Sequence, residues 1–206
     1  MKPILKFLIE AGKLKGKKRR GWKLHQIKNP ETTAEHIFHL CLLVWTMGEK
    51  KKIDTGRAIK IALVHDLCEV YAPDLTPYDP LLPKNRKKIK EILKKWPQFS
   101  QQMKKEKEKG KKQVESAALE KLVVGLPVGL KEKIKTLWLD YEQGLTKEGR
   151  FVKQADKLVN FLQGMIYWQK GDEIQYNLWM RWIREIIDDP VLLELLKNIE
   201  ENFFSA

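Results

Sequence analysis

Residues 59–70 read IKIALVHDLCEV, and this stretch decides the fold of the chain. We predict that it belongs to one helix, which begins at a cap on Asp54 and runs to about Val70. Its apolar residues leave almost no polar face, a pattern typical of a buried helix. Two adjacent ionisable side chains, His65 and Asp66, interrupt the apolar run. Their burial costs free energy unless they are paired or bind a metal ion. The pair therefore predicts an enzyme site inside the core.

The rest of the chain indicates helix after helix, with no convincing alternating strand. Thr32 and Glu35 form a capping box that predicts a helix to about Met47. Three prolines in the segment 72–80 stiffen a loop. Further helices are expected at 84–124 (broken near Trp96-Pro97, with Gly110 a second candidate break), at 131–141, at 147–170 after a cap at Thr146, after a cap at Asp172, and from Asp189-Pro190 onward. We therefore predict a single all-α domain, a helical bundle over residues 1–206, with a metal site in its core.

Length and cysteine usage set the class of protein. A chain of 206 residues suits one domain with a substantial core. Cys41 and Cys68 fit neither a zinc spacing nor a disulfide framework, so a reducing cytoplasm is expected. The longest apolar run, about residues 40–45, is far shorter than the roughly 20 residues that a membrane span needs. We expect neither a signal peptide nor a membrane anchor.

The net charge of +13 is concentrated in two segments. Residues 84–112 hold 13 Lys and Arg against 3 Asp and Glu, and residues 13–23 hold 7 basic residues and no acidic one. The longer segment is either a solvated surface of the kind that heat-adapted proteins favour or a nucleic-acid-binding surface. The shorter segment is interpreted as attracting phosphate, for the reason given below.

Four ionisable residues on three predicted helices occupy positions that should be buried: His36, His65, Asp66 and Asp156. One alone would more often be a core residue with a hydrogen-bond partner, but four together favour a divalent metal ion held by nitrogen and oxygen ligands. Glu69 follows His65 by four residues and should project beside it, either as a general base or as a group that holds a ligand imidazole. His39 does not complete an H-E-x-x-H motif and is expected either to pack or to support a metal ligand, and His25 is unassigned.

Five motifs carry a resemblance to a known family. They are Gly21-Trp22, Pro-Glu-x-x-x-Glu-His at 30–36, His65-Asp66 with Glu69, Asp-Leu-Thr-Pro at 74–77 and Phe-Val-Lys-x-x-Asp-Lys-Leu at 151–158. In this order the motifs resemble the HD-domain superfamily of phosphohydrolases, and within it the 5′-deoxynucleotidase branch. The resemblance extends from about Phe7 to Leu196.

The resemblance implies a role for each motif residue. His36, His65, Asp66 and Asp156 would bind one divalent ion (Co, Mn, Zn or Mg), and Glu69 would be the catalytic carboxylate. Asp74 would bind the sugar hydroxyl and Thr76 would contact the substrate, while Trp22 would close the sugar side of the pocket and clash with a ribose 2′-hydroxyl. In the bacterial branch an arginine directly precedes the tryptophan. Gly21 stands there in this chain, so Arg20 is our candidate for gripping the phosphate, with Arg19 as the alternative.

The activity implied by the resemblance is metal-dependent hydrolysis of deoxyribonucleoside 5′-monophosphates to deoxyribonucleoside and phosphate, by a homodimer. One alternative is an HD phosphohydrolase of another nucleotide, such as a triphosphate, a cyclic dinucleotide or an antibiotic-type nucleotide. Another is a nucleic-acid-binding protein that uses residues 84–112. A third is an HD fold that binds metal without turnover.

Overall fold

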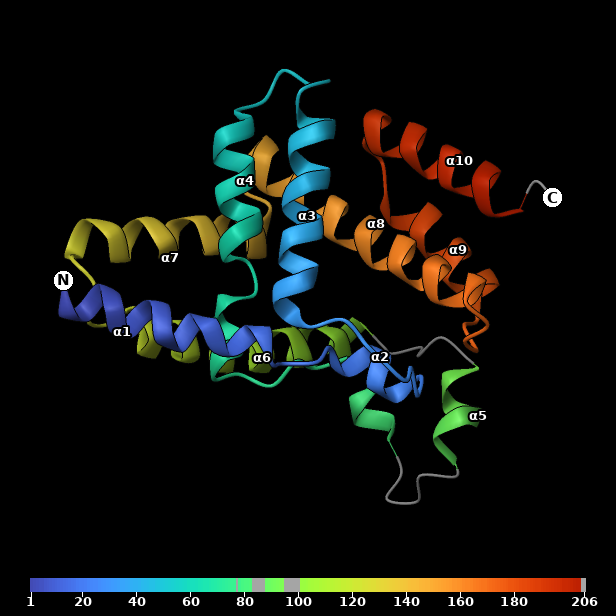
Figure 1. Ribbon diagram of the computed structural model, residues 1–206, viewed down its shortest axis with the longest axis horizontal. Helices are drawn as coiled ribbons and strands as arrows, with labels where there is room; N and C mark the ends of the chain where they lie inside the picture. The colour runs from blue at the N-terminus through green and yellow to red at the C-terminus, as the bar shows by residue number, and fades with distance from the viewer. Residues whose placement is uncertain (77, 83–87, 95–100, 205–206) are drawn as a thin grey trace. The chain divides into compact units, whose positions relative to one another are not determined.

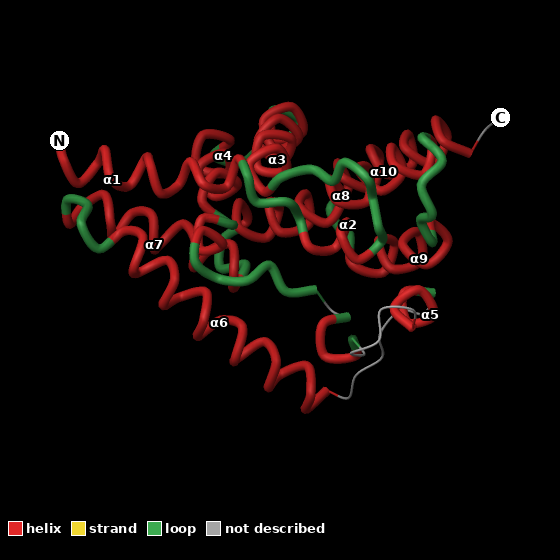
Figure 2. Tube along the Cα trace, turned by 60° about the horizontal axis from the view of Figure 1, so that its bottom comes forward, coloured by secondary structure: helices red, strands yellow, loops and turns green. Residues whose placement is uncertain are grey.

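The structure is a computed structural model, and it describes residues 1–76, 78–82, 88–94 and 101–204. Over these residues the chain is built from helices joined by loops, without a β-strand, as Figure 2 shows. A bridge of β type between Lys18 and Thr32 is isolated and belongs to no strand. The all-α prediction is therefore confirmed. The predicted break at Trp96-Pro97 and residues 84–87 of the longer basic segment lie outside the described residues.

The α-helices are α1 (Lys2–Ala11), α2 (Arg20–Leu24), α3 (Thr33–Gly48), α4 (Thr55–Val64), α5 (Ile89–Leu93), α6 (Gln101–Val123), α7 (Val128–Gln143), α8 (Lys147–Gln169), α9 (Tyr176–Ile186) and α10 (Pro190–Phe204). Short 3-10 helices among the described residues include η1 (Gly12–Lys15), η2 (Leu67–Val70) and η3 (Asp79–Leu81). Figure 1 labels the α-helices in chain order. Among the described residues, no helix combines the length and the apolar character that a membrane span requires.

The helices divide between two compact units. Unit 1 consists of Met1–Thr33 and Asp66–Lys135, and unit 2 of Ala34–His65 and Thr136–Ala206. The chain passes between the units at three points, and one of these separates His65 from Asp66. The single domain over 1–206 stays a prediction.

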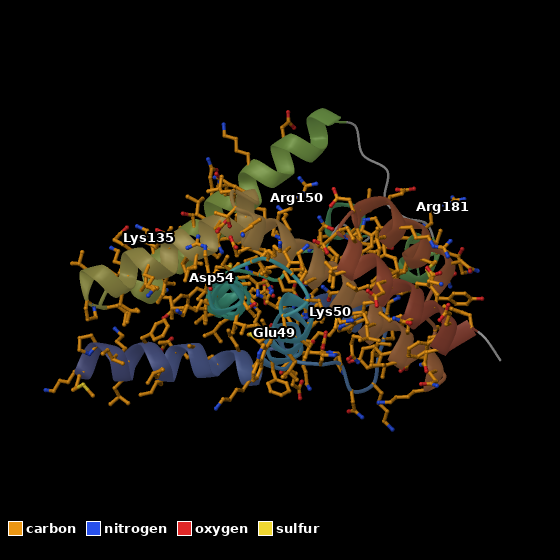
Figure 3. All side chains as sticks on the ribbon, turned by 90° about the horizontal axis from the view of Figure 1, so that it is seen from above. Glu49, Lys50, Asp54, Lys135, Arg150 and Arg181 are labelled. Atoms are coloured by element: carbon orange, nitrogen blue, oxygen red, sulfur yellow. The ribbon has the colours of Figure 1, made fainter. Side chains whose placement is uncertain are left out.

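Unit 2 is organised around α8, which contacts α4, α9 and α10. Figure 1 shows α9 and α10 beside it. Val152, Ala155 and Val159, which lie at helical spacing around Asp156, are fully buried, so Asp156 lies on the inward face of α8, as its predicted burial requires. Within the same unit, Cys41 Sγ contacts the Ile59 carbonyl and joins α3 to α4. Figure 3 looks down on the loop between these two helices, from Glu49 and Lys50 to Asp54.

Caps and one glycine determine where the helices of unit 2 begin. The side chains of Asp54, Thr146 and Asp189 accept hydrogen bonds from the first turns of α4, α8 and α10, as predicted. At Gly149, in the first turn of α8, an added Cβ would lie 2.6 Å from the Asp140 carbonyl oxygen and would also overlap the Asp140 carboxylate. Only glycine therefore allows the start of α8 to lie against the end of α7.

Unit 1 is built from α1, α6 and the short 3-10 helices. α1 contacts η1, η2 and α6, and α6 also packs on η2. The side of α6 that is buried carries Leu119, Leu122 and Val123. This packing positions the segment that follows Asp66.

The single helix predicted through residues 59–70 is wrong. α4 ends at Val64, Asp66 has φ −106° and ψ 12°, and Leu67–Val70 is a 3-10 helix. Leu63 is 53% exposed, so the burial of this stretch is also incomplete. The cause is tertiary. The half-buried carboxylate of Asp66 and the buried carboxylate of Glu69 accept hydrogen bonds from Arg19 and Thr33 within unit 1, and these bonds outweigh the continuation of the α-helix.

Three other boundaries differ from prediction. α9 begins at Tyr176 after Gln175, not after Asp172, because the backbone amide of Asp172 bonds the Tyr167 carbonyl and closes the end of α8. α7 begins at Val128, since the Pro127 carbonyl accepts the first hydrogen bonds of the helix. α6 runs through Gly110, which has open space around it and needs no break.

Candidate active site

Unit 2 brings together three of the predicted metal ligands. His36 lies on α3, His65 directly follows α4, and Asp156 lies on α8. They are 0%, 1% and 3% exposed, and one ligand atom from each lies within 4.8 Å of the other two. The His36 and His65 ring centroids are 5.4 Å apart, and His36 Nε2 lies 2.9 Å from Asp156 Oδ1.

The chemistry of this group fits a divalent cation. Two imidazole nitrogens and a carboxylate oxygen are a common donor set for zinc, cobalt or manganese. Two ligands at ~2.1 Å from one ion lie roughly 3 Å apart, which the separation of His36 Nε2 and Asp156 Oδ1 matches. His65 Nδ1 lies 2.7 Å from the Ala62 carbonyl, which only accepts hydrogen bonds. His65 Nδ1 therefore carries the proton, and Nε2 is the atom with a lone pair for a metal.

Three side chains donate hydrogen bonds to Asp156: Tyr141, Lys157 and Asn160. Burial raises the pKa of Asp156, but Lys157, His36 and His65 together outweigh burial and hold that pKa well below its usual range. The carboxylate is therefore ionised, as a metal ligand must be. Sequence reasoning assigned no role to these three donors. Asn160, four residues after Asp156, could have been found from helical spacing, whereas nothing in the sequence links Tyr141 to it.

Asp66 belongs to unit 1, where its carboxylate accepts a hydrogen bond from Arg19 Nη1 at 2.8 Å. Its predicted role as a metal ligand stays a prediction. The side chains of Arg19 and Asp66 are 14% and 17% exposed, so their ion pair is largely shielded from water. Position along the chain did not indicate this pairing, since 46 residues separate the two.

Glu69, the predicted catalytic carboxylate, is buried in unit 1 and bonded at both its side chain and its backbone. Thr33 Oγ1 donates to Glu69 Oε2 at 2.9 Å, and Lys17 Nζ donates to the Glu69 carbonyl and, at 2.6 Å, to the Ala72 carbonyl. Burial, and then the charges of Asp66 and Asp74, raise the pKa of Glu69 to about 8. A carboxyl with a pKa near neutrality suits both removal and return of a proton.

The predicted phosphate and sugar contacts gather around one loop of unit 1. The Arg20 backbone amide donates to Asp74 Oδ2 at 2.7 Å, and the Arg20 guanidinium pairs with Asp79. Thr76 donates to Asp79 Oδ2 from its backbone at 2.6 Å and from its hydroxyl at 2.7 Å. Asp79, which sequence reasoning did not single out, therefore organises the loop. The Arg20 side chain is 45% exposed, against 14% for Arg19.

Trp22 is buried in unit 1, and its indole Nε1 donates to Glu31 Oε1 at 2.9 Å. Glu31 belongs to the Pro-Glu-x-x-x-Glu-His motif, so one residue of that motif holds the Trp22 indole in place. His25 lies near Trp22 and Tyr78, with ring centroids 6.4 and 6.5 Å away. His39 is half-buried on α3, and burial lowers its pKa.

Fold and site together define an all-α protein with a candidate divalent-metal centre made of two histidines and an aspartate. The family profile described as HD domain matches residues 11–186, so the chain belongs to the HD domain family. The ordered histidine and aspartate motifs of the sequence predicted this family, and the prediction is confirmed.

Relatives and solved structures agree with this assignment. The 5′-deoxynucleotidase HDDC2 of Xenopus laevis is 31% identical over 166 residues, which cover 81% of this chain and 70% of the relative. The 5′-deoxynucleotidase hdd1 of Schizosaccharomyces pombe is 27% identical, with 98% of this chain and 93% of the relative covered. These relatives confirm the resemblance to the 5′-deoxynucleotidase branch.

Two solved structures share the fold. One is a conserved hypothetical protein from Pyrococcus furiosus, with a TM-score of 0.68, 24% identity and coverage of 96% of this chain and 99% of that one. The other is described as a predicted metal-dependent phosphohydrolase from Magnetospirillum magnetotacticum, with a TM-score of 0.65, 19% identity and coverage of 98% and 94%.

Proposed function

We propose that this chain is a metal-dependent 5′-deoxynucleotidase, which hydrolyses deoxyribonucleoside 5′-monophosphates to deoxyribonucleoside and phosphate. The observation that carries the proposal is the convergence of His36, His65 and Asp156 in the core of unit 2. The names of the relatives, each a 5′-deoxynucleotidase, support the reaction and the substrate class.

His36, His65 and Asp156 would hold the ion, with Asp66 as a fourth ligand because of its place beside His65 in the HD motif. A divalent cation supplies Lewis-acid stabilisation of a phosphoryl group and acidifies water. The nitrogen and oxygen donors are compatible with Co, Mn, Zn or Mg and do not select among them.

Glu69 is proposed to move the protons of the reaction. Its raised pKa allows the carboxylate to accept a proton from the attacking water and the resulting acid to return a proton to the leaving nucleoside oxygen. Thr33 and Lys17 would fix its orientation, because they bond its side chain and its backbone carbonyl.

For the phosphate, Arg19 is better supported than Arg20. Arg19 is the more buried of the two and forms an ion pair with Asp66, whereas Arg20 forms an ion pair with Asp79. A guanidinium carries five N–H donors in a planar fork whose geometry matches the oxygens of a phosphate. Asp74 is proposed to bind the sugar hydroxyl and Thr76 to contact the substrate, with the buried Trp22 ring as the wall that rejects a ribose 2′-hydroxyl.

The test combines metal analysis of the purified protein with phosphate release from deoxyribonucleoside and ribonucleoside monophosphates, deoxynucleoside triphosphates and cyclic dinucleotides. Metal at one ion per chain and release from the deoxyribonucleoside monophosphates are expected. Release only from larger nucleotides would reject the proposal. Nucleic-acid binding that falls steeply with salt and survives Asp66→Ala would favour the binding-protein alternative instead.

His36 and His39 lie one turn apart on α3 and form a matched pair of variants. His36→Ala should abolish both metal binding and turnover, whereas His39→Ala should retain bound metal. Full metal occupancy in His36→Ala would reject the ligand assignment.

A homodimer is also proposed from the resemblance, and a cytoplasmic location from the absence of a disulfide framework in the sequence. Three large apolar side chains of α3, Phe38, Leu42 and Trp45, are exposed at spacings that place them on one helix face, which supports a protein contact there. The molar mass in solution, measured by light scattering, tests the dimer.

A further inference from the structure

The two carboxylate oxygens of Asp156 have different surroundings. Oδ1 lies 2.9 Å from His36 Nε2 and 3.0 Å from Asn160 Nδ2. Oδ2 accepts from the Tyr141 hydroxyl at 2.8 Å and from Lys157 Nζ at 2.5 Å. Because two donors already occupy Oδ2, Oδ1 is the oxygen that Asp156 presents to the imidazoles.

Tyr141 contacts a second candidate ligand as well. Its ring centroid lies 5.0 Å from that of His65, with the two planes inclined by 56°. One buried side chain from α7 therefore touches both His65 and Asp156. Fixing Tyr141 costs the conformational entropy of two side-chain torsions. Fixing Lys157 costs more entropy, because its side chain is longer and 34% exposed.

The backbone that carries Tyr141 is held in place by the residue before it. The Asp140 carboxylate is buried and accepts from Arg57 Nη2 at 2.6 Å, from the Thr146 amide at 2.9 Å and from the Thr146 hydroxyl at 2.7 Å. These bonds tie the end of α7 to α4 and to the cap of α8. His65 directly follows α4, and Asp156 lies on α8.

We propose that Tyr141 is a positioning residue of the metal centre: its hydroxyl turns Asp156 so that Oδ1 alone binds the ion, and its ring orients the His65 imidazole. The inference rests on the proposed function, since it assumes that His36, His65 and Asp156 hold a metal. Groups that hydrogen-bond metal ligands orient them, and their loss typically weakens metal affinity about 10- to 100-fold.

The experiment is a titration of the metal-free full chain with Co²⁺, followed by calorimetry and by the visible absorption of the bound ion. Tyr141→Phe retains the ring and removes the hydroxyl. We expect about 10- to 100-fold weaker Co²⁺ binding and altered cobalt absorption bands. Tyr71→Phe is the matched control: it removes a tyrosine hydroxyl that donates to Glu10 at 2.8 Å, and should change neither readout.

Co²⁺ affinity of Tyr141→Phe within about twofold of wild type, with an unchanged spectrum, would overturn the inference. So would an equal loss of thermal stability in the metal-free and Co²⁺-loaded forms at unchanged affinity, because that outcome describes a purely structural hydrogen bond. Failure of the wild-type chain itself to bind any divalent ion would instead overturn the proposed function, and the inference with it.

A crystal structure of the Co²⁺-loaded wild-type chain tests the inference without any variant, in case Tyr141→Phe does not fold. Asp156 bound to cobalt through Oδ1 alone, with Oδ2 on the Tyr141 hydroxyl, would support it. Bidentate Asp156, or a Tyr141 hydroxyl bonded elsewhere, would contradict it.

Discussion

Individual carboxylates in this chain differ in their chemistry because their neighbours differ. Burial raises the pKa of Asp156, but Lys157 and two imidazoles lower it further than burial raises it. For Glu69, burial and two nearby carboxylates raise the pKa to about 8 against the opposing effect of Arg19 and Lys17. The first carboxylate is therefore suited to bind a cation, and the second to exchange a proton near neutral pH.

Glu69→Gln should keep the bound metal and lose most of the turnover. The amide retains the shape and can still bond Thr33, but it cannot accept a proton, so we expect kcat to fall about 10²- to 10⁴-fold. Metal content and phosphate release, measured on the same preparation, check this. Near-normal kcat would assign Glu69 a structural role.

Arg19→Ala and Arg20→Ala distinguish the two candidate phosphate contacts. If Arg19 grips the phosphate, its loss should lower kcat/KM at least about 100-fold, equivalent to about 3 kcal/mol for a lost charge-assisted contact, whereas Arg20→Ala should have a smaller effect. Steady-state kinetics with one deoxyribonucleoside monophosphate provide the comparison. The reverse order would restore Arg20 as the phosphate contact.

At the scale of elements, the site depends on where helices end. α4 ends immediately before His65, α7 ends just after Tyr141, and α8 begins at a cap that also bonds Asp140. The close approach at Gly149 keeps the last two of these helix ends together. Small changes at helix ends should therefore affect the metal centre more than changes on the exposed helix faces.

Gly149→Ala should destabilise the fold. Its Cβ would overlap both the carbonyl and the carboxylate of Asp140, and overpacking of this kind costs about 1 to 3 kcal/mol. For a chain of this size that corresponds to a melting temperature lower by roughly 2 to 12 °C. Gly110→Ala is the control, because open space surrounds Gly110 on α6 and alanine favours a helix. Equal melting temperatures for the two variants would contradict the packing argument.

For the whole molecule, the strong positive charge is partly balanced internally. In unit 1, the basic segment 13–23 supplies Lys17, Arg19 and Arg20, which bond backbone carbonyls or the carboxylates of Asp66 and Asp79. The net charge of +13 for the whole chain therefore overstates the positive charge with which this segment could bind a nucleic acid. Arg20 supports the loop that carries the proposed substrate contacts, and Lys17 and Arg19 support the segment from Asp66 to Ala72.

Metal binding should stabilise the whole chain, because ligands from α3, α8 and the residue after α4 converge only in the folded state. An ion at 100 times its dissociation constant adds about 2.7 kcal/mol, or roughly 5 to 10 °C in melting temperature. Thermal melts in Co²⁺ and in EDTA measure this difference. Asp156→Asn should abolish most of the shift, and an undiminished shift in that variant would place the ion elsewhere.

The sequence by itself determined the helical class, the caps at Asp54, Thr146 and Asp189, the inward face of α8 and three histidine and aspartate residues that meet in unit 2. These features depend on local periodicity, on capping side chains and on short motifs, all of which are written along the chain. Local information of this kind also carried the resemblance to the HD domain family.

Only the tertiary structure decided the break after Val64, the pairing of Asp66 with Arg19 and the bonds from Tyr141 to Asp156 and from Thr33 to Glu69. The three contacts join residues separated by at least 15 positions in the sequence. A buried carboxylate must find a donor, and which donor it finds depends on how the elements pack rather than on the residues beside it in sequence.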